Sequence, residues 1–345
     1  MKVWQIAAGE PGRDYRELFF DHDMMTMGPS HLGDALSNKY MRGSANSPDR
    51  QVHSFTHGPK PGDRVLMRFA HDVIGVGQIP TEDRYQYAFD QRFGCIYGWD
   101  LCHSRRVTWV ENYELGDLAF VYLAAKQKPT FTQVHERSIV KMVEDIDNTY
   151  FARPLKEMPN INAAIYSDEE LGVELFRAGI SNKNINDILI ALQQAERLCA
   201  WYPCCGRSPS ENEIVSHIIL PLFLGLGWSH QQIAVEWNRV DVAFFKKTPT
   251  VSENCVMVLE AKGLGSALSE ALNQPKVYVQ SLKLTNVKYI LTTDGENLFV
   301  HEKSGDEWEP NPSGYLNVRT LQKQYVLPRN TSLVDTLVRL QPSMV

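Results

Sequence analysis

The 345-residue sequence has no excess of positive charge and no long hydrophobic run. Its 35 Lys and Arg residues against 41 Asp and Glu residues give a net charge of −6, which excludes a polybasic nucleic-acid coat protein. The longest mostly apolar run, 218–228, contains proline and glycine and is shorter than the ~20 residues of a membrane helix. The first residues lack the pattern of a secretory signal. We therefore expect a soluble, cytoplasmic protein without a membrane partner.

Cysteine spacings typical of zinc sites and phosphate-binding glycine loops are also missing. Six cysteines without a secretory signal indicate reduced thiols. Neither Cys95-x6-Cys102-His103 nor the cluster at 199–205 has the paired C-x2–4-C spacing of a structural zinc site, so we expect no zinc. No GxxxxGK[ST] motif occurs, and we expect no NTP partner.

The remaining composition is that of a globular protein, and its local patterns divide the chain into three parts. Residues 1–113 carry short strand-like runs between turn signals, which favours a small, curved or barrel-like sheet. Residues 114–205 carry polar helical stretches, typical of a helical connector. Residues 206–345 predict the order αβββαβ, with helices at 210–225 and 266–282. The fold class is predicted as α+β and multidomain.

Two acids and a lysine stand at the ends of predicted strands in the third part. Asp241 lies in the apolar run 239–245. Glu260 stands at the end of the apolar strand 255–261, and Lys262 follows directly after it. Because side chains alternate along a strand, Glu260 and Lys262 point to the same side. Two carboxylates are a usual protein contribution to a Mg²⁺ site, and a lysine can hold a water or stabilise phosphate charge. We predict a Mg²⁺ site here, in which Mn²⁺ is expected to substitute.

A third carboxylate is predicted on the helix that begins near Ser210. Glu211 shares a helical face with the apolar residues at 214, 215, 218 and 222 and is expected to point inward. Glu213 is the alternative, since the sequence allows a capping box either from Ser208 to Glu211 or from Ser210 to Glu213. On the later helix, Gln274 and Tyr278 are four residues apart and share a face, where they can orient the metal site or contact a phosphate.

Together these residues resemble the PD-(D/E)XK nuclease superfamily. The resemblance covers about 208–302 and is strongest to the nuclease domain of type I restriction-enzyme motor subunits. It implies that Asp241, Glu260 and Glu211 are metal ligands, that Lys262 is the catalytic lysine, and that Gln274 and Tyr278 are accessory residues.

The first part resembles the PUA-like superfamily, especially the EVE domains attached to modification-dependent restriction enzymes, and so implies a small β-barrel that reads a modified or flipped base. Aromatic faces stabilise an extruded base by stacking. Trp4 and Trp99 are candidates for stacking or for the core, whereas Trp109 is expected in the core. The other candidates are pocket residues Met27, Ser30 and Asp100 and phosphate contacts Arg105 and Arg106.

The two resemblances imply a modification-dependent restriction endonuclease. The expected domains are a reader at 1–113, a helical connector at 114–205 and a nuclease at 206–345. The expected partner is double-stranded DNA with a modified base, presumed from the resemblance to be a 5-substituted cytosine, and cutting both strands favours a homodimer. Two alternatives stay open: a metal-dependent nuclease acting on RNA or repair intermediates, and a non-catalytic binder of modified nucleic acid.

Overall fold

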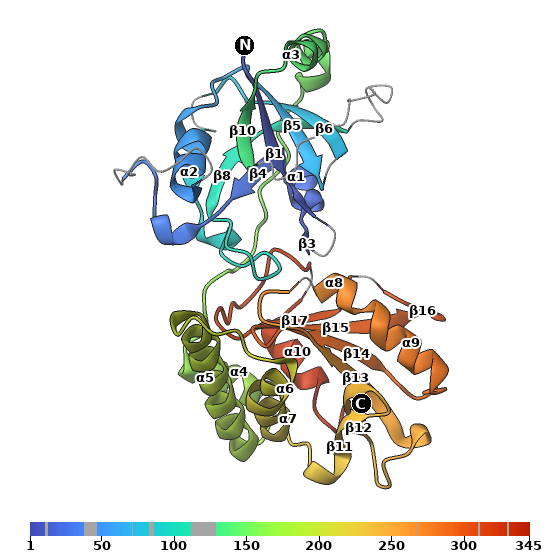
Figure 1. Ribbon diagram of the computed structural model, residues 1–345. Helices are drawn as coiled ribbons and strands as arrows, with labels where there is room; N and C mark the ends of the chain where they lie inside the picture. The colour runs from blue at the N-terminus through green and yellow to red at the C-terminus, as the bar shows by residue number, and fades with distance from the viewer. Residues whose placement is uncertain are drawn as a thin grey trace. The chain divides into compact units, whose positions relative to one another are not determined.

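The computed structural model describes residues 1–345 except 11–12, 38–46, 71, 83–85, 112–128, 267, 310 and 330. The chain forms two compact units, Met1–Ile161 and Asn162–Val345 (Figure 1). Both contain helices and sheets, as predicted for an α+β protein. The predicted connector 114–205 is not a unit of its own, because its helices between 168 and 204 pack into the core of the second unit.

A five-stranded sheet is the centre of the first unit. Its order is β10-β1-β5-β6-β9, and β1 and β5 are parallel while the other neighbours are antiparallel. The strands are β1 (Val3–Ala7), β5 (Arg64–Phe69), β6 (Asp72–Gln78), β9 (Thr108–Glu111) and β10 (Phe131–Val134). The predictions for 3–7 and 64–69 are confirmed residue for residue.

A second, three-stranded sheet of order β4-β8-β7 is antiparallel throughout. Its strands are β4 (Met24–Met27), β7 (Tyr87–Phe89) and β8 (His103–Arg106), and a short hairpin joins β2 (Gly9–Glu10) to β3 (Arg13–Asp14). Within the described residues no sheet closes on itself, so the predicted β-barrel is wrong for this part of the chain.

Helices cover the first unit's sheet. They are α1 (Arg16–His22), α2 (Pro48–His57) and α3 (Arg137–Glu144), with 3-10 turns η1 (Ser30–Leu32), η3 (Gln91–Phe93) and η5 (Asn148–Phe151). Aliphatic residues of the sheet pack against α3 and η5. Stacked rings form another part of the core, including Phe19 on Trp109, whose exposed fraction of 3% agrees with its expected core position. Gly77 is required beside this ring, since a Cβ there would lie 2.6 Å from a Trp109 ring carbon.

The second unit is built on a seven-stranded sheet of order β11-β12-β13-β14-β15-β16, with β17 also paired to β15. The strands are β11 (Ile233–Trp237), β12 (Val240–Phe245), β13 (Cys255–Ala261), β14 (Tyr289–Thr293), β15 (Asn297–Ser304), β16 (Glu307–Trp308) and β17 (Gly314–Asn317). β13 and β14 are parallel, so both end at the same edge of the sheet. The predicted strand 255–261 is confirmed residue for residue, and the element order αβββαβ is the observed one.

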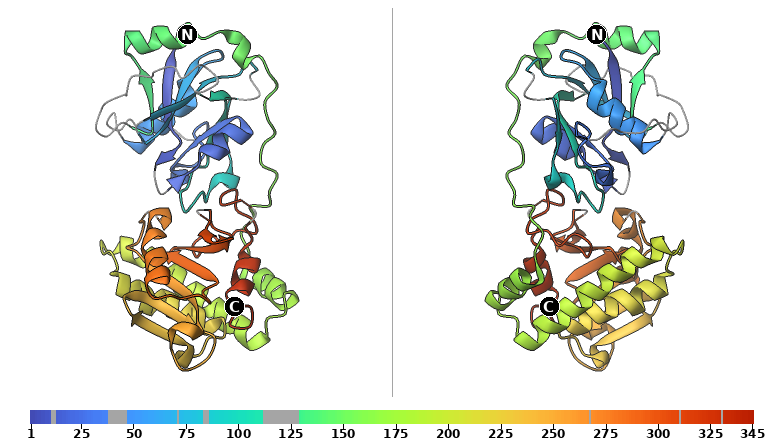
Figure 2. Two further views of the ribbon diagram at one scale, coloured as in Figure 1. Left: turned by 90° about the vertical axis from the view of Figure 1, so that its right-hand side faces the viewer. Right: turned by 90° about the vertical axis from the view of Figure 1, so that its left-hand side faces the viewer.

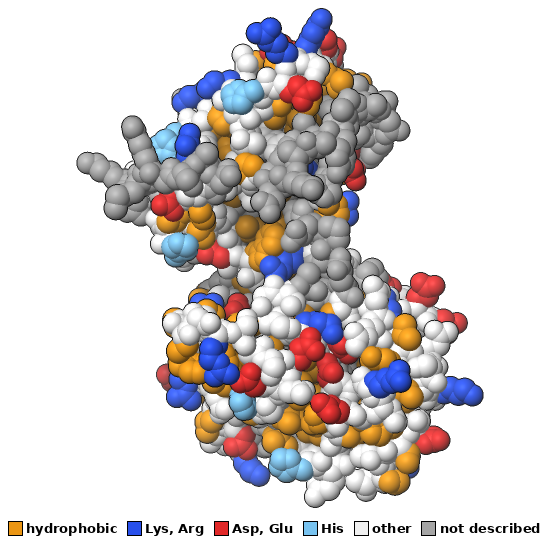
Figure 3. Space-filling model, viewed as in Figure 1, with side chains coloured by type: hydrophobic (Ala, Val, Ile, Leu, Met, Phe, Trp, Pro, Cys, Tyr) orange, Lys and Arg blue, Asp and Glu red, His pale blue; other side chains and the backbone are white. Residues whose placement is uncertain are grey.

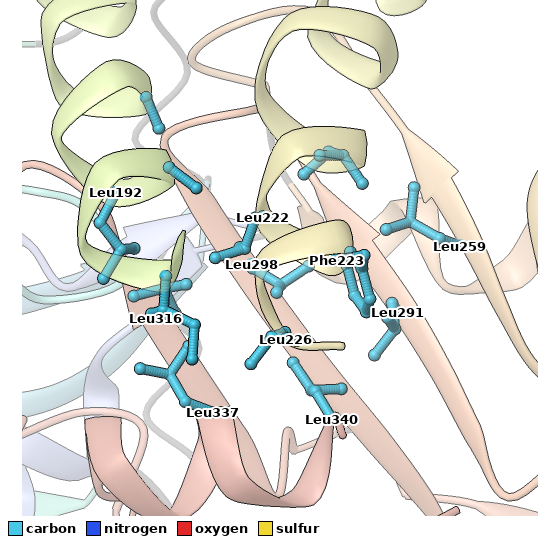
Figure 4. Close-up of a cluster of buried hydrophobic side chains, with 14 of the residues drawn as sticks. Leu192, Leu222, Phe223, Leu226, Leu259, Leu291, Leu298, Leu316, Leu337 and Leu340 are labelled. Carbon is cyan, nitrogen blue, oxygen red and sulfur yellow. The ribbon is translucent and has the colours of Figure 1, made fainter. Parts of the chain in front are cut away.

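Helices lie on both faces of this sheet (Figures 1 and 2). One face carries α4 (Asp168–Arg177), α5 (Asn182–Cys204), the helix of α6 (Glu211–Ile214), η6 (Val215–Ile219) and α7 (Leu220–Gly225), and α10 (Leu333–Arg339). The other carries α8 (Leu268–Ala271) and α9 (Asn273–Ser281); short 3-10 turns are η7 (His230–Gln232) and η8 (Ser252–Asn254). Figure 4 shows leucines of α5, α7, α10 and the sheet meeting in the larger of the two cores.

The segment η6 is a π-helical turn. Pro221 explains it, because proline has no N–H to donate to the carbonyl four residues earlier, that of His217. Gln194 of α5 donates to this carbonyl at 3.4 Å. The first turn of the helix, which carries Glu211, is thereby offset from an ideal α-helical path.

We predict that His301 makes the second unit acid-sensitive. It is fully buried on β15, its Nδ1 lies 3.2 Å from the carbonyl oxygen of Glu309, and burial lowers its pKa to about 4. Between pH 6.5 and 4 the unfolded chain therefore binds a proton that the folded chain does not, and stability falls as the pH drops through this range. Between pH 7 and pH 5, wild type should lose about 2 kcal/mol of unfolding free energy through this histidine. His301→Asn should not show this loss. Urea unfolding of both proteins measures this difference, and parallel pH profiles would contradict it.

Candidate active site

A two-residue hairpin positions Asp241 at one edge of the second unit's sheet. β11 and β12 are joined by Asn238 and Arg239, whose φ angles of 50° and 77° are those of a type I′ turn. Asp241 is the second residue of β12 and is half-buried. Its Oδ2 accepts a hydrogen bond of 2.7 Å from the backbone N–H of Ala261 on β13, which fixes the carboxylate beside the end of that strand.

Glu260 and Lys262 stand where β13 ends. All residues of β13 are buried, and Glu260 is 1% exposed. Lys262 Nζ lies 2.5 Å from Glu260 Oε1, as expected for side chains two apart on a strand. The other carboxylate oxygen, Oε2, is buried and has no hydrogen-bond partner in the described part of the protein. A buried carboxylate oxygen without a partner is energetically costly, and this one is available to a cation.

The helix that begins after Ser210 brings Glu211 to the same lysine. Glu213 forms the capping box with Ser210, so its carboxylate serves the helix terminus. Glu211 Oε1 lies 3.9 Å from Lys262 Nζ, and Glu211 is therefore the helix acid at this site. Its side chain is 50% exposed, so the expectation that it points into the core is wrong: it stands in the first helical turn, at the rim.

Gln274 and Tyr278 complete the cluster from the opposite layer of helices. Gln274 Nε2 donates to the Tyr278 hydroxyl at 2.9 Å, and Gln274 Oε1 accepts from Lys262 Nζ at 3.4 Å. The helix predicted over 266–282 is broken, and Gln274 lies in the first turn of α9. Pro275 follows it at a first-turn position, where proline is tolerated because no intrahelical bond to its nitrogen is needed.

The two strand acids are destabilised in their charged forms. Burial raises the pKa of Asp241, against the opposing effects of the Ala261 amide and Lys262. Burial also raises the pKa of Glu260, and the hydrogen bond from Lys262 only partly offsets this effect. For Lys262, burial lowers the pKa, but its hydrogen bond to Glu260 and the charges of Glu260, Glu211 and Asp241 outweigh this effect, and the net shift is upward. The ammonium of Lys262 alone thus does not compensate the negative charge of Asp241 and Glu260.

Asp241 and Glu260 are the residues that could hold Mg²⁺ at this site. This ion commonly binds through one or two carboxylates, with waters and a substrate phosphate as its other ligands. The unpartnered Glu260 Oε2 supports this assignment. The described residues contain no group of three or more His, Cys, Asp or Glu side chains arranged to hold a metal, and Glu211 as a third ligand stays a prediction. Its contact in the structure is with Lys262.

Asp294, which the sequence analysis did not single out, ties the loop after Lys262 to the sheet. It is fully buried after β14, and it accepts hydrogen bonds from the backbone N–H groups of Gly265, Glu296 and Asn297. Burial raises its pKa, with the Asn297 bonds opposing the shift. The Thr-Thr-Asp-Gly sequence at the end of a predicted strand was the available signal.

In the first unit, the structure contradicts the stacking role of Trp4. Trp4 is 5% exposed, stacks on Phe131 with ring centroids 5.3 Å apart, and donates from Nε1 to Asp63 at 3.1 Å. It is a core residue, and Met27 on β4 is also buried. Trp99 is half-buried, with its ring edge-on to Tyr15 and the Arg13 guanidinium 5.1 Å from its centroid.

The predicted phosphate contacts are engaged within the protein. Arg105 is 3% exposed and donates to the carbonyls of Thr56 and Pro59, so its predicted phosphate contact is wrong, and burial lowers its pKa to about 10. Arg106 donates to the carbonyls of Asp23 and Lys156.

Two further pocket candidates remain predictions. Asp100 is half-buried beside Trp99 in the chain, and the side chain of Ser30 lies outside the described residues.

Comparisons with known proteins do not identify the chain. No family model matches it, and no curated protein matches it. Among solved structures it is similar to a crystal structure of protein Atu2648 from Agrobacterium tumefaciens, at 14% sequence identity and a TM-score of 0.21. The match covers 46% of this chain and 100% of that chain, and at this TM-score it carries no argument. In the described residues, no helix is both long and apolar enough to cross a membrane.

We predict that Mn²⁺ binding raises the stability of the protein through Asp241 and Glu260. A ligand at ten times its dissociation constant adds about 1.4 kcal/mol to the unfolding free energy. Asp241→Asn and Glu260→Gln should each remove this gain. Glu213→Gln is the matched control, because Gln preserves the capping box and Glu213 contacts Ser210 and Arg207 instead of Lys262. Thermal and urea unfolding with and without Mn²⁺ measure the effect; an unchanged gain in Asp241→Asn would contradict the assignment.

Proposed function

We propose that the protein is a modification-dependent endonuclease that hydrolyses DNA phosphodiesters with Mg²⁺. One observation carries the catalytic half of this proposal: Glu260, Asp241 and Lys262 meet at the end of β13, and one buried carboxylate oxygen has no hydrogen-bond partner among the described residues. The residues are those of the PD-(D/E)XK pattern, and their elements follow the order αβββαβ. The modification-reading half rests on the resemblance of residues 1–113 to PUA-like domains.

The arrangement suits phosphodiester hydrolysis because of the charges that develop in that reaction. Mg²⁺ bound by Asp241 and Glu260 would supply water activation and charge neutralisation. Lys262 contacts Glu260, Glu211 and Gln274. Its ammonium is therefore held in place by three side chains instead of being paired with one alone. From this position it can donate to a water or to a phosphate oxygen that gains negative charge.

Tyr278 and Gln274 have a positioning role in this proposal. The amide of Gln274 bridges the Tyr278 hydroxyl and the lysine, and so orients Lys262 from the α9 side of the site. Glu211 contacts the same ammonium from the α6 side at a longer distance. The lysine is thereby aligned from both helical layers, a requirement for a group that must be preorganised toward the phosphate.

We predict that Asp241→Asn and Lys262→Ala each lower the turnover number for DNA cleavage by about three orders of magnitude, ~4 kcal/mol of activation free energy. Lys247→Ala, which removes an exposed lysine of the same unit, should cleave as wild type does. Plasmid cleavage with Mg²⁺ measures all three. Undiminished cleavage by Lys262→Ala would rule out the proposed catalytic site, and cleavage of RNA in preference to DNA would favour a nuclease of another pathway.

We further predict that Trp99, and not Trp4, governs the dependence on base modification. Trp99→Ala should reduce the preference for modified DNA, because it removes a half-exposed ring, and should leave the fold intact. Trp4→Ala should instead destabilise the first unit by about 3–5 kcal/mol, because Trp4 is buried against Phe131.

Matched duplexes that are unmodified or carry 5-methylcytosine, 5-hydroxymethylcytosine or N6-methyladenine give the readout. Equal wild-type cleavage of all four would contradict the reader proposal. Binding of modified duplex without any cleavage would favour a non-catalytic binder.

A further inference from the structure

Trp201 is the most exposed tryptophan of the chain. It lies in the last turn of α5 and is 45% exposed, whereas the other six tryptophans of the chain are buried or half-buried. Its neighbour Tyr202 is 2% exposed and packs edge-on against it, with ring centroids 5.2 Å apart. The indole ring is therefore held in place on one side and accessible on the other.

The end of α5 folds Arg207 back over this pair of rings. Gly206 adopts the left-handed conformation, with φ of 64°, and the N–H of Arg207 donates to the carbonyl of Tyr202 at 3.0 Å. This is the bonding of a Schellman motif, in which the residue after the glycine contacts the last helical turn. The Arg207 guanidinium lies 5.7 Å from the Trp201 ring centroid and 5.8 Å from that of Tyr202.

Arg207 also connects the aromatic pair to the helix of the active site. Its Nη2 lies 2.9 Å from Glu213 Oε1, and Glu213 is two residues from Glu211, which contacts Lys262. Arg207 is 54% exposed, and a guanidinium has five N–H donors, so the ion pair leaves donors for another anion. The exposed indole and guanidinium are thus joined to α6, the helix that carries Glu211, through the ion pair of Arg207 with Glu213.

We propose that Trp201 and Arg207 bind an unpaired nucleotide of the DNA strand next to the cleaved bond. This inference rests on the proposed function. The base stacks on the exposed indole face and the guanidinium contacts the adjoining phosphate. Every base offers a π-face, so such a contact holds a strand without reading its sequence. Arg207 is joined by its ion pair with Glu213 to the helix that carries Glu211. This connection, and the pairing of an aromatic ring with a cation, favour a nucleic-acid strand over an apolar partner.

Binding of a fluorescein-labelled 20-nucleotide single strand to the full-length protein, followed by anisotropy in EDTA, tests the proposal. Trp201→Ala should weaken binding about 5- to 100-fold, the range typical of one stacked base. Trp201→Phe retains an aromatic face and should stay within about threefold of wild type. Phe176→Ala removes another exposed aromatic residue of the same unit, on α4 and 61% exposed, and should have no effect.

Cleavage kinetics with Mg²⁺ separate this proposal from the proposed function. Trp201→Ala should raise the KM for a substrate with an unpaired region and leave kcat unchanged, because Trp201 contacts no reacting atom. If wild type cleaves and Trp201→Ala matches it in both affinity and KM, the strand contact is overturned and the proposed function stands. If wild type neither binds nor cleaves DNA under these conditions, both are overturned.

Discussion

The ion pair between Lys262 and Glu260 is the interaction on which the candidate site depends. Glu260 is almost completely buried at the end of β13, a position where an unpaired carboxylate would be strongly disfavoured. The lysine compensates one carboxylate oxygen at 2.5 Å, and the other has no partner in the described part of the chain. Glu211 and Gln274 contact the same ammonium. Side chains from β13, α6 and α9 therefore all meet at this single group.

The sheet explains why the cluster stands at this edge. β13 and β14 are parallel, so the last residues of both strands lie at the same end of the sheet. The N–H of Lys262 donates to the carbonyl of Thr293, which continues the ladder beyond the strand, and the buried Asp294 holds Gly265 of the following loop. The backbone on both sides of the lysine is therefore held by β14 and by the residue that follows it, and the ammonium contacts Glu260, Glu211 and Gln274.

The sequence predicts the buried strands and the residues that meet at their ends, because these follow from local rules. Apolar runs between turn signals locate 255–261, and alternation places Glu260 and Lys262 on one side. The break before Gln274 is not predicted, since it depends on where the chain packs. The π-helical turn has a local cause in Pro221, but local rules do not decide whether a helix ends or continues at a proline. The half-exposed position of Glu211 follows from its place in the first helical turn, which helical periodicity alone does not reveal.

The errors in the first unit have a different physical cause. Alternation along β1 and β8 shows that Trp4 and Arg105 point to one side of a strand, but not which sides are covered by helices and neighbouring strands. Trp4 is enclosed by Phe131 and Asp63, and Arg105 by carbonyls at the end of α2 and just beyond it. The sequence around a buried arginine does not differ from that around an exposed one. Only the long-range packing of the folded chain distinguishes the two.

Several arginines of the first unit are buried or form ion pairs within the unit. In the proposed function, this lowers the positive charge available for contacts with DNA. Arg64 and Arg105 are buried, and Arg153 pairs with the buried Asp23. On the face shown in Figure 3, the described Lys and Arg side chains are scattered among acidic ones instead of gathering into one basic area. Affinity for unmodified DNA depends mainly on phosphate contacts, and these three arginines are engaged inside the unit instead. If the proposed function holds, selectivity would come from individual bases and from the phosphate at the candidate metal site, and binding to plain DNA should be weak and should fall further as salt is added.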